Sequence, residues 1–277
     1  MMIEKQSVVK KVLLYALLIA LTVITLLPLL WMLSSSFKLS SEVFTFPIQW
    51  IPKVFHYENY VTIWEKINLD RYIFNSFKLS IIITLIQLIT SSFAAYGFSK
   101  CRFPGRNILF LSYVATIAIP WQVYMLPQYI MMQKFQLIDT HLAIILLQSF
   151  TAFGVFLLRQ FYISIPNELL EAARIDGLSE YGTFGRIVLP LTKPAMATLT
   201  IMSFVTVWND FMGPMIYFNS DKNKTIQLGI QMFTGIYSTE YGLIMSTSIL
   251  ALIPVLVVFL AFQRFFVEGI ASSGLKG

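Results

Sequence analysis

Six long stretches of this 277-residue sequence carry almost no charged side chains. They are 19 to 27 residues long, and only the fifth contains a charge, at Asp210. An α-helix needs about 20 residues to cross the ~30 Å hydrocarbon core of a bilayer, because each residue adds ~1.5 Å. We therefore expect an all-α integral membrane protein with six transmembrane helices, at about residues 12–36, 72–99, 107–132, 140–161, 194–217 and 241–264.

The composition agrees with a chain that lies in lipid. Hydrophobic residues make up 57% and charged residues 12%, and the mean hydropathy is +0.71, whereas a soluble globular chain carries about 25% charge. The high apolar content excludes intrinsic disorder. A disulfide scaffold is excluded because the sequence has one cysteine, Cys101.

The positive charges predict the orientation. Lys5, Lys10 and Lys11 precede the first span, and the positive-inside rule then places the N-terminus in the cytoplasm. Six spans return the C-terminus to the same side. The segments expected inside hold 12 Lys and Arg in 70 residues, against seven in 66 outside. This bias accounts for the net charge of +6 without a nucleic-acid partner.

The loop at 164–192, between the fourth and fifth spans, is predicted to fold into two short helices. Pro166 suits the first turn of a helix, and Glu168 favours the positive end of the helix dipole. Gly177 can close this helix in the left-handed conformation, and Ser179 can cap the next one. The small apolar surface beside acidic residues favours docking against another protein. A helix lying on the bilayer is the alternative.

The same loop resembles the coupling-loop motif of bacterial ABC importer membrane subunits, through Glu171-Ala172-Ala173, Gly177 and Ile187-Val188-Leu189-Pro190. Other stretches are similar to the carbohydrate-uptake branch, and in particular to the second permease of maltose and multiple-sugar systems. They are Asn75-Ser76, the run from Ala94 to Lys100, Trp208-Asn209-Asp210-Phe211 with Pro214, and the tail from Gln263 to Gly277.

The resemblance implies a multi-pass subunit of the bacterial cell membrane that imports sugars or oligosaccharides by alternating access. Two separate ATPase subunits would bind ATP and Mg and dock on the loop through Glu171, Ala172, Ala173, Asp176 and Gly177. A second permease of similar topology and an extracellular sugar-binding protein are the other expected partners. The chain itself has no phosphate-binding G-x-x-x-x-G-K-[ST] motif, so no cofactor is expected in it.

Polar and aromatic residues within the spans are candidates for the substrate path: Trp121, Gln122, Gln148, Asn209 and Asp210. Polar groups are costly in a membrane and usually face protein or water. Trp121, Gln122 and Tyr124 lie between Pro120 and Pro127, a stretch that could kink the third span and present a stacking ring with polar partners to a sugar. Membrane aromatics also serve as packing or interface residues. Hydrogen bonding between helices is the alternative for Asn209 and Asp210.

The outer loop at 218–240 begins with a polar stretch and continues with an amphipathic one. By resemblance it contacts the docked binding protein, through Thr225, Gln227, Gly229 and Gln231. A re-entrant connector packed against the outer mouth is the alternative. His56 and His141 have no second ligand at metal spacing, so we expect no metal site.

An ion-gradient-driven secondary transporter is the alternative function. Such carriers usually show inverted repeats and a membrane-embedded acidic residue. Asp210 is the one carboxylate within the predicted spans, and we find no convincing repeat. The elaborate loop also has no obvious use in a gradient-driven carrier.

Overall fold

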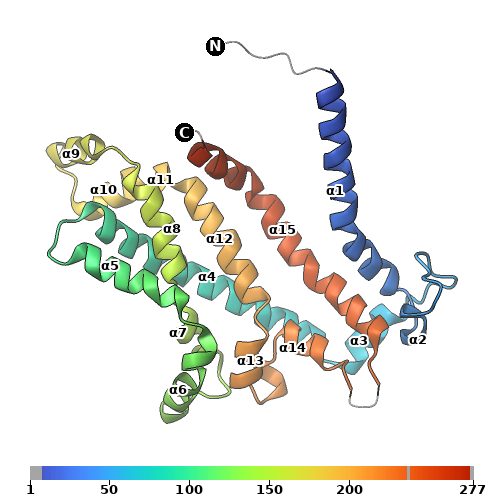
Figure 1. Ribbon diagram of the computed structural model, residues 1–277. Helices are drawn as coiled ribbons and strands as arrows, with labels where there is room; N and C mark the ends of the chain where they lie inside the picture. Colours follow the sequence, from blue (N-terminus) through green and yellow to red (C-terminus); the bar gives the residue numbers. More distant parts are fainter. Residues whose placement is uncertain (1–7, 236–237, 275–277) are drawn as a thin grey trace. The chain divides into compact units, whose positions relative to one another are not determined.

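The computed structural model describes the backbone of residues 8–235 and 238–274, and this part of the chain is almost entirely helical (Figure 1). Its one extended pairing is an isolated bridge between Thr234 and Thr239. Lys5 and the tail from Leu275 to Gly277 lie outside the described residues. The chain divides into two compact units, one built from residues up to 68 together with 230–252, the other from 69–229 together with the segment from 253 onward.

The first unit contains the long apolar helix α1 (Val8–Ser35), the short helices α2 (Ser40–Val43) and α3 (Asn59–Lys66), and the beginning of α15 (Tyr241–Gly274). Ser246 Oγ in α15 donates to the carbonyl of Ser36 at 2.8 Å. At Gly242 a Cβ atom would lie 2.4 Å from the carbonyl oxygen of Lys38, so this close approach requires glycine. These contacts fix the start of α15 against the end of α1.

The second unit is organised around α4 (Leu69–Lys100), which packs against α8 (Ala152–Ile163) and α12 (Lys193–Trp208) (Figure 1). Small residues permit the approach of α4 and α8. A Cβ atom at Gly154 would lie 2.6 Å from Ser91 Oγ. Membrane helices commonly pack through such small side chains, because lipid supplies no hydrophobic driving force for helix association.

Within the residues that the structure describes, four helical segments are long and apolar enough to cross a membrane: Val9–Ser35, Leu69–Lys100, His141–Ile163 and Tyr241–Arg264. They overlap the first, second, fourth and sixth predicted spans. The third of these segments comprises α7 (His141–Gln148) and α8. Two bent helix pairs raise the number to six if each pair is one span.

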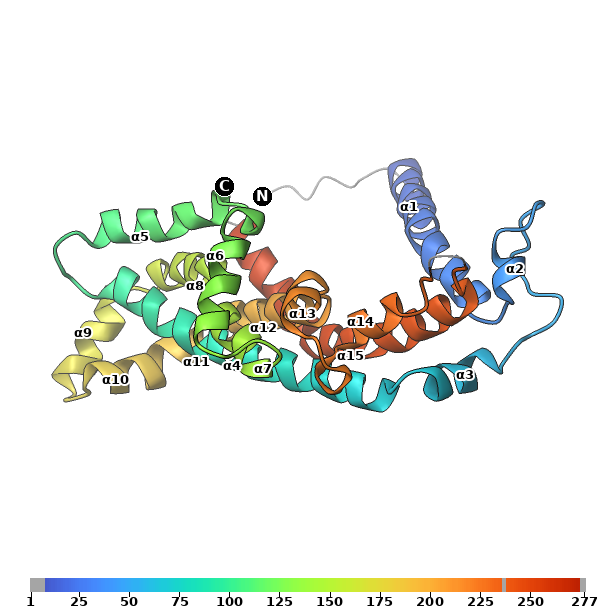
Figure 2. The same ribbon diagram turned by 90° about the horizontal axis from the view of Figure 1, so that it is seen from below.

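The first bent pair falls within the predicted span at 107–132. It consists of α5 (Arg106–Ala115) with the 3-10 turn Thr116–Ala118, followed by α6 (Trp121–Lys134), and the two parts are bent by 98° (Figure 2). Pro120 explains the break, because a proline disfavours helical geometry in the residue before it, and Ile119 is extended at φ −85° and ψ 112°. Where the sequence predicted one span that could kink at its prolines, the structure has two helices with a sharp bend between them.

The second bent pair joins Glu180–Leu191 to α12 at 79°. The helix α12 then ends at Trp208, and α13 (Met212–Tyr217) follows after three residues. The predicted span at 194–217 thus contains an interruption at 209–211. Beyond it lie the 3-10 turn Asp221–Asn223 and α14 (Ile226–Gln231).

Candidate functional site

The loop between α8 and α12 begins with α9 (Asn167–Ile175), which closes in a Schellman motif. Gly177 has φ +82°, as the sequence predicted. The Leu178 amide donates to the carbonyl of Ala173 at 2.9 Å, and the Gly177 amide donates to that of Arg174 at 3.0 Å. These two bonds satisfy carbonyls that the helix end would leave unpaired.

A second helix, α10 (Glu180–Thr183), follows at once and continues into the π-helical turn Phe184–Val188 and the short α11 (Leu189–Leu191). Ser179 caps α10, because its Oγ accepts from the Gly182 amide at 3.2 Å. The predicted pair of short helices around a glycine is confirmed.

The two faces of α9 differ in burial. Leu170 and Ala173 are buried within the chain, at 2% and 5% exposure. Glu171, Ala172 and Ile175 are exposed, Ile175 at 86%. The sequence had placed Ala173 on the docking surface, but its side chain faces the chain's own interior. The exposed face therefore has Glu171 and Ala172 at its centre.

A hydrogen-bonded network ties the loop to α4. Glu180 Oε1 accepts from Arg174 Nε at 2.7 Å, and Glu180 Oε2 accepts from the hydroxyl of Tyr96 at 2.7 Å. Tyr96 is buried at 6% exposure, and its ring contacts Phe184 at 5.2 Å between centroids. The hydrogen bonds from Arg174 and Tyr96 lower the pKa of the Glu180 carboxyl below its ordinary value.

Lys100, the last residue of α4, provides a second attachment. Its Nζ donates to the carbonyl of Ile165 at 2.6 Å and to Asn167 Oδ1 at 2.9 Å, just where α9 begins. The loop is thus attached to α4 at its entry and at the junction of α9 with α10, so a displacement of α9 would be transmitted to α4.

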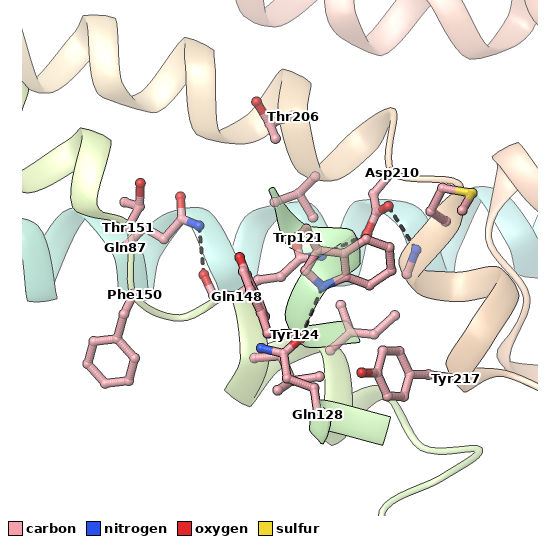
Figure 3. Close-up of a pocket in the computed structure, with 15 residues that line it drawn as sticks. Gln87, Trp121, Tyr124, Gln128, Gln148, Phe150, Thr151, Thr206, Asp210 and Tyr217 are labelled. Atoms are coloured by element: carbon pink, nitrogen blue, oxygen red, sulfur yellow. Dashed lines mark hydrogen bonds between the residues drawn. The ribbon is translucent and has the colours of Figure 1, made fainter. Parts of the chain in front are cut away.

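A second candidate site is a cavity of about 370 Å³ in the second unit (Figure 3). It combines aromatic, amide and hydroxyl side chains with one carboxylate, and α4, α6, α7, α12 and α13 contribute to its wall. The lining residues are Gln87, Trp121, Tyr124, Gln128, Ile144, Leu147, Gln148, Phe150, Thr151, Thr206, Val207, Asp210, Met212, Gly213 and Tyr217.

Hydrogen bonds order the polar part of this cavity (Figure 3). Gln148 Nε2 donates to Asp210 Oδ2 at 2.7 Å, and Gln87 Nε2 donates to the carbonyl of Gln148 at 2.7 Å. Trp121 Nε1 donates to Gln128 Oε1 at 3.0 Å, which fixes the indole ring. The helix break at 209–211 places Asp210 so that its other oxygen accepts from the Gly213 amide at 3.0 Å.

Three of the five predicted path residues, Trp121, Gln148 and Asp210, meet in this cavity. Gln122 is exposed and lies outside the lining. Asn209 is also outside it, and its Oδ1 accepts from Gln227 Nε2 at 3.3 Å. Sequence reasoning missed Gln87, Gln128, Thr151 and Thr206. Like the residues that were predicted, each of these four is a polar side chain within a charge-free run. That feature is too common in the sequence to single them out.

The outer segment packs against α4 within the second unit. Asn75 Nδ2 donates to the carbonyls of Lys222 and Lys224 at 2.9 and 2.8 Å, and Ser76 Oγ accepts from the Ile226 amide at 2.9 Å. Of the predicted binding-protein contacts, Thr225 and Gly229 are buried, Gln227 is half-buried and Gln231 is exposed. This packing agrees with the connector alternative for the first half of the segment.

Asp139, in the link between α6 and α7, anchors the same segment. Its carboxylate accepts from the amides of Asn219 and Ser220, both at 2.9 Å, from the Ser220 hydroxyl, and from Asn223 Nδ2 at 3.1 Å. Burial alone would raise the pKa of the Asp139 carboxyl, and these hydrogen bonds outweigh it, so the pKa lies well below its ordinary value.

Apolar helices of the second unit around a polar cavity, with a loop of short helices attached to the central α4, are the features of a membrane transport protein. The chain belongs to the family described as binding-protein-dependent transport system inner membrane components, which it matches over residues 87–271. It is therefore the membrane-spanning subunit of a binding-protein-dependent ABC importer, and ATP hydrolysis in this family resides on a separate subunit.

Individual relatives agree with this assignment. The chain is 34% identical over 257 residues to the arabinooligosaccharides transport system permease protein AraQ of Halalkalibacterium halodurans, covering 92% of each chain. It is 31% identical over 259 residues to the lactose transport system permease protein LacG of Rhizobium radiobacter, covering 94% of each. Its fold resembles that of a bacterial ABC transporter involved in alginate import, with a TM-score of 0.81, 20% identity, and coverage of 96% and 99%.

Proposed function

We propose that this chain moves sugars or oligosaccharides across the bacterial cell membrane by alternating access. The relatives that cover nearly its whole length are permeases for arabinooligosaccharides and lactose, which supports a carbohydrate substrate. The cavity is consistent with such a substrate, because it combines aromatic rings with amide and hydroxyl groups.

The main support for the proposal is an exposed surface on α9, which we call the coupling surface. Glu171 and Ala172 lie at its centre, and Asp176 lies beside it. This surface is exposed while the opposite side of α9 is buried, and the loop is hydrogen-bonded to α4 through Tyr96 and Lys100. A pair of ATPase subunits with bound ATP and Mg would dock on it. Their closure would move α9, and α4 would transmit that movement into the helices that line the cavity.

The complete importer would contain a second permease subunit of similar topology and an extracellular sugar-binding protein. In this arrangement the chain has six spans with both ends in the cytoplasm. The first bent helix pair is one span, and in the second pair α12 begins the fifth span while Glu180–Leu191 stays in the coupling loop. The binding protein would meet the outer segment through Thr225, Gln227, Gly229 and Gln231. Of these, Gln231 is already exposed, and the buried members would support the shape of the contact.

Reconstitution tests the proposal. The chain is assembled in liposomes with its second permease and ATPase pair, and uptake of labelled neutral oligosaccharides is measured with and without ATP and the binding protein. We expect uptake only when both are present. Uptake by this chain alone, driven by a proton or Na⁺ gradient, would instead support the secondary-transporter alternative and overturn the proposal.

A further inference from the structure

The cavity wall carries charge of one sign. Among its fifteen lining residues Asp210 is the one charged side chain, and none is Lys or Arg. The remaining polar groups are neutral amides and hydroxyls, such as Gln87, Gln128 and Thr206. A ligand that enters the cavity therefore meets the negative charge of Asp210 and no compensating cation among the lining residues.

Both carboxyl oxygens of Asp210 accept hydrogen bonds. Gln148 Nε2 donates to Oδ2, and the Gly213 amide donates to Oδ1. These two donors hold the carboxyl group of Asp210 in position at the edge of the cavity.

The aromatic rings of the cavity are available to a ligand. Tyr124 and Phe150 are exposed, at 39% and 69%, and Trp121 is half-buried with its N–H already bonded to Gln128. Figure 3 shows the Trp121 ring in the middle of the cavity, between Asp210 and Gln128. Such rings contact the C–H faces of a sugar, while the amides and the carboxylate satisfy its hydroxyls.

We infer that this cavity binds neutral sugar units and discriminates against acidic ones, with Asp210 as the residue that sets the charge preference. This inference rests on the proposed function and names its substrate class. A uronate carboxylate within about 6 Å of Asp210 would be repelled strongly enough to weaken binding about tenfold or more, because screening by water is incomplete in a protein cavity. A neutral hydroxyl donates to the same carboxylate and gains from it.

A cysteine protection assay reports binding in the cavity directly. Thr206 is exposed and lines the cavity, so T206C, made in a Cys101→Ser background, gives this chain one thiol. The assembled importer in nanodiscs of neutral lipid, without binding protein, is treated with N-ethylmaleimide. The rate at which the peptide carrying T206C is labelled is measured at increasing concentrations of galactobiose or of digalacturonate. These two disaccharides are similar in size and differ in charge.

We expect galactobiose to slow labelling at concentrations about tenfold or more below those that digalacturonate requires. Asp210→Asn keeps an acceptor for the Gly213 amide, and a flip of the Gln148 amide lets its Oε1 accept from the new Nδ2. This variant should bring the two concentrations within about threefold. Glu65→Gln removes a carboxylate outside the cavity and should leave their ratio unchanged. Each rate is normalised to the sugar-free rate of the same variant.

Equal protection by the two sugars in the T206C variant that retains Asp210 would overturn the inference. An unchanged ratio in Asp210→Asn would do so too, as would the absence of protection by either sugar at about 100 mM. ATP- and binding-protein-dependent uptake, measured on the same preparation, tests the proposed function separately. Uptake with no charge discrimination would reject the inference alone, and absent uptake would reject the proposed function.

Discussion

At the scale of single residues, the carboxylate of Glu180 joins three parts of the chain. It accepts from Arg174 at the end of α9 and from Tyr96 in α4, and it lies in the first turn of α10. The sequence predicted a cap and a helix start at this point, but not the contact with α4. That contact spans 84 residues of sequence, and no local pattern indicates which buried tyrosine lies opposite a loop carboxylate.

Replacing Glu180 by Gln should loosen the loop and remove part of its pH dependence. The pKa of Glu180 is lowered in the folded chain, so its contribution to stability is present above its ordinary pKa and is lost as the pH falls through the lowered value. Hydrogen exchange of residues 167–183 is measured from pH 7 to below 4 and corrected for the intrinsic pH dependence of the amide exchange rate. The protection of these amides should fall on acidification in the unmodified chain.

Glu180→Gln should exchange faster already at pH 7 and show a flatter acid profile. Tyr96→Phe is the matched control, because it removes one donor and keeps the titrating carboxylate together with the Arg174 partner. An identical acid profile in Glu180→Gln and the unmodified chain would show that this carboxylate does not hold the loop.

Gly177 permits a second residue-scale prediction. At φ +82° a side chain is strained, yet a Cβ atom there would meet nothing within 4 Å. The cost of Gly177→Val is therefore backbone strain, about 1–3 kcal/mol, without a clash. Gly177→Asn should be milder, because asparagine tolerates the left-handed region. Pull-down of the ATPase should fall with Val and largely survive with Asn, and equal loss in both would point to a direct contact at this position.

At the scale of elements, α9 illustrates what periodicity could and could not predict. Its bounds, its glycine closure and its amphipathic character followed from the sequence. The sequence did not predict which face of α9 points inward. In this nine-residue helix Ala172 and Ala173 are neighbours, so a face centred on one differs by a single position from a face centred on the other. Burial of Ala173 beside an exposed Ala172 resolves this choice.

Leucine substitutions at these two alanines should therefore fail in different ways. Ala173→Leu inserts a larger side chain into the chain's own packing and should cost about 1–3 kcal/mol of local stability. Ala172→Leu projects outward, so the chain should remain as stable as before while binding of the ATPase decreases by steric exclusion. Hydrogen exchange of α9 and ATPase pull-down separate the effects. Normal ATPase binding and uptake in Ala172→Leu would remove the docking assignment.

Two of the predicted spans are interrupted in the structure. Charge-free length predicted continuous spans at 107–132 and 194–217, and in both the structure has an interruption. The one at Pro120 had a visible cause in the sequence. The one at 209–211 did not, since Asn209 and Asp210 are only mildly unfavourable in a helix. It is stabilised by a hydrogen bond from the Gly213 amide to Asp210 Oδ1, which becomes evident only in the folded chain.

At the scale of the whole molecule, the number of spans decides which loops share a side of the membrane. Six spans place Arg186 inside and Lys134 outside, relative to a cytoplasmic N-terminus. Four spans, with both bent pairs lying outside the bilayer core, would reverse the two positions, whereas Lys53 would be outside in either case. The side chains of Lys134 and Arg186 are exposed within the chain, so a labelling reagent can reach each of them from the side of the membrane on which it lies.

Single cysteines at these positions, introduced into a Cys101→Ser background, therefore separate the topologies. In intact cells a membrane-impermeant maleimide should label K53C and K134C and spare R186C, and R186C should react once the membrane is permeabilised. Labelling of R186C before permeabilisation, together with protection of K134C, would establish the four-span arrangement. In that case α9 would lie on the outer side, where no ATPase could reach Glu171. The same pair of variants thus tests the span count and the side of the membrane on which energy is coupled to transport.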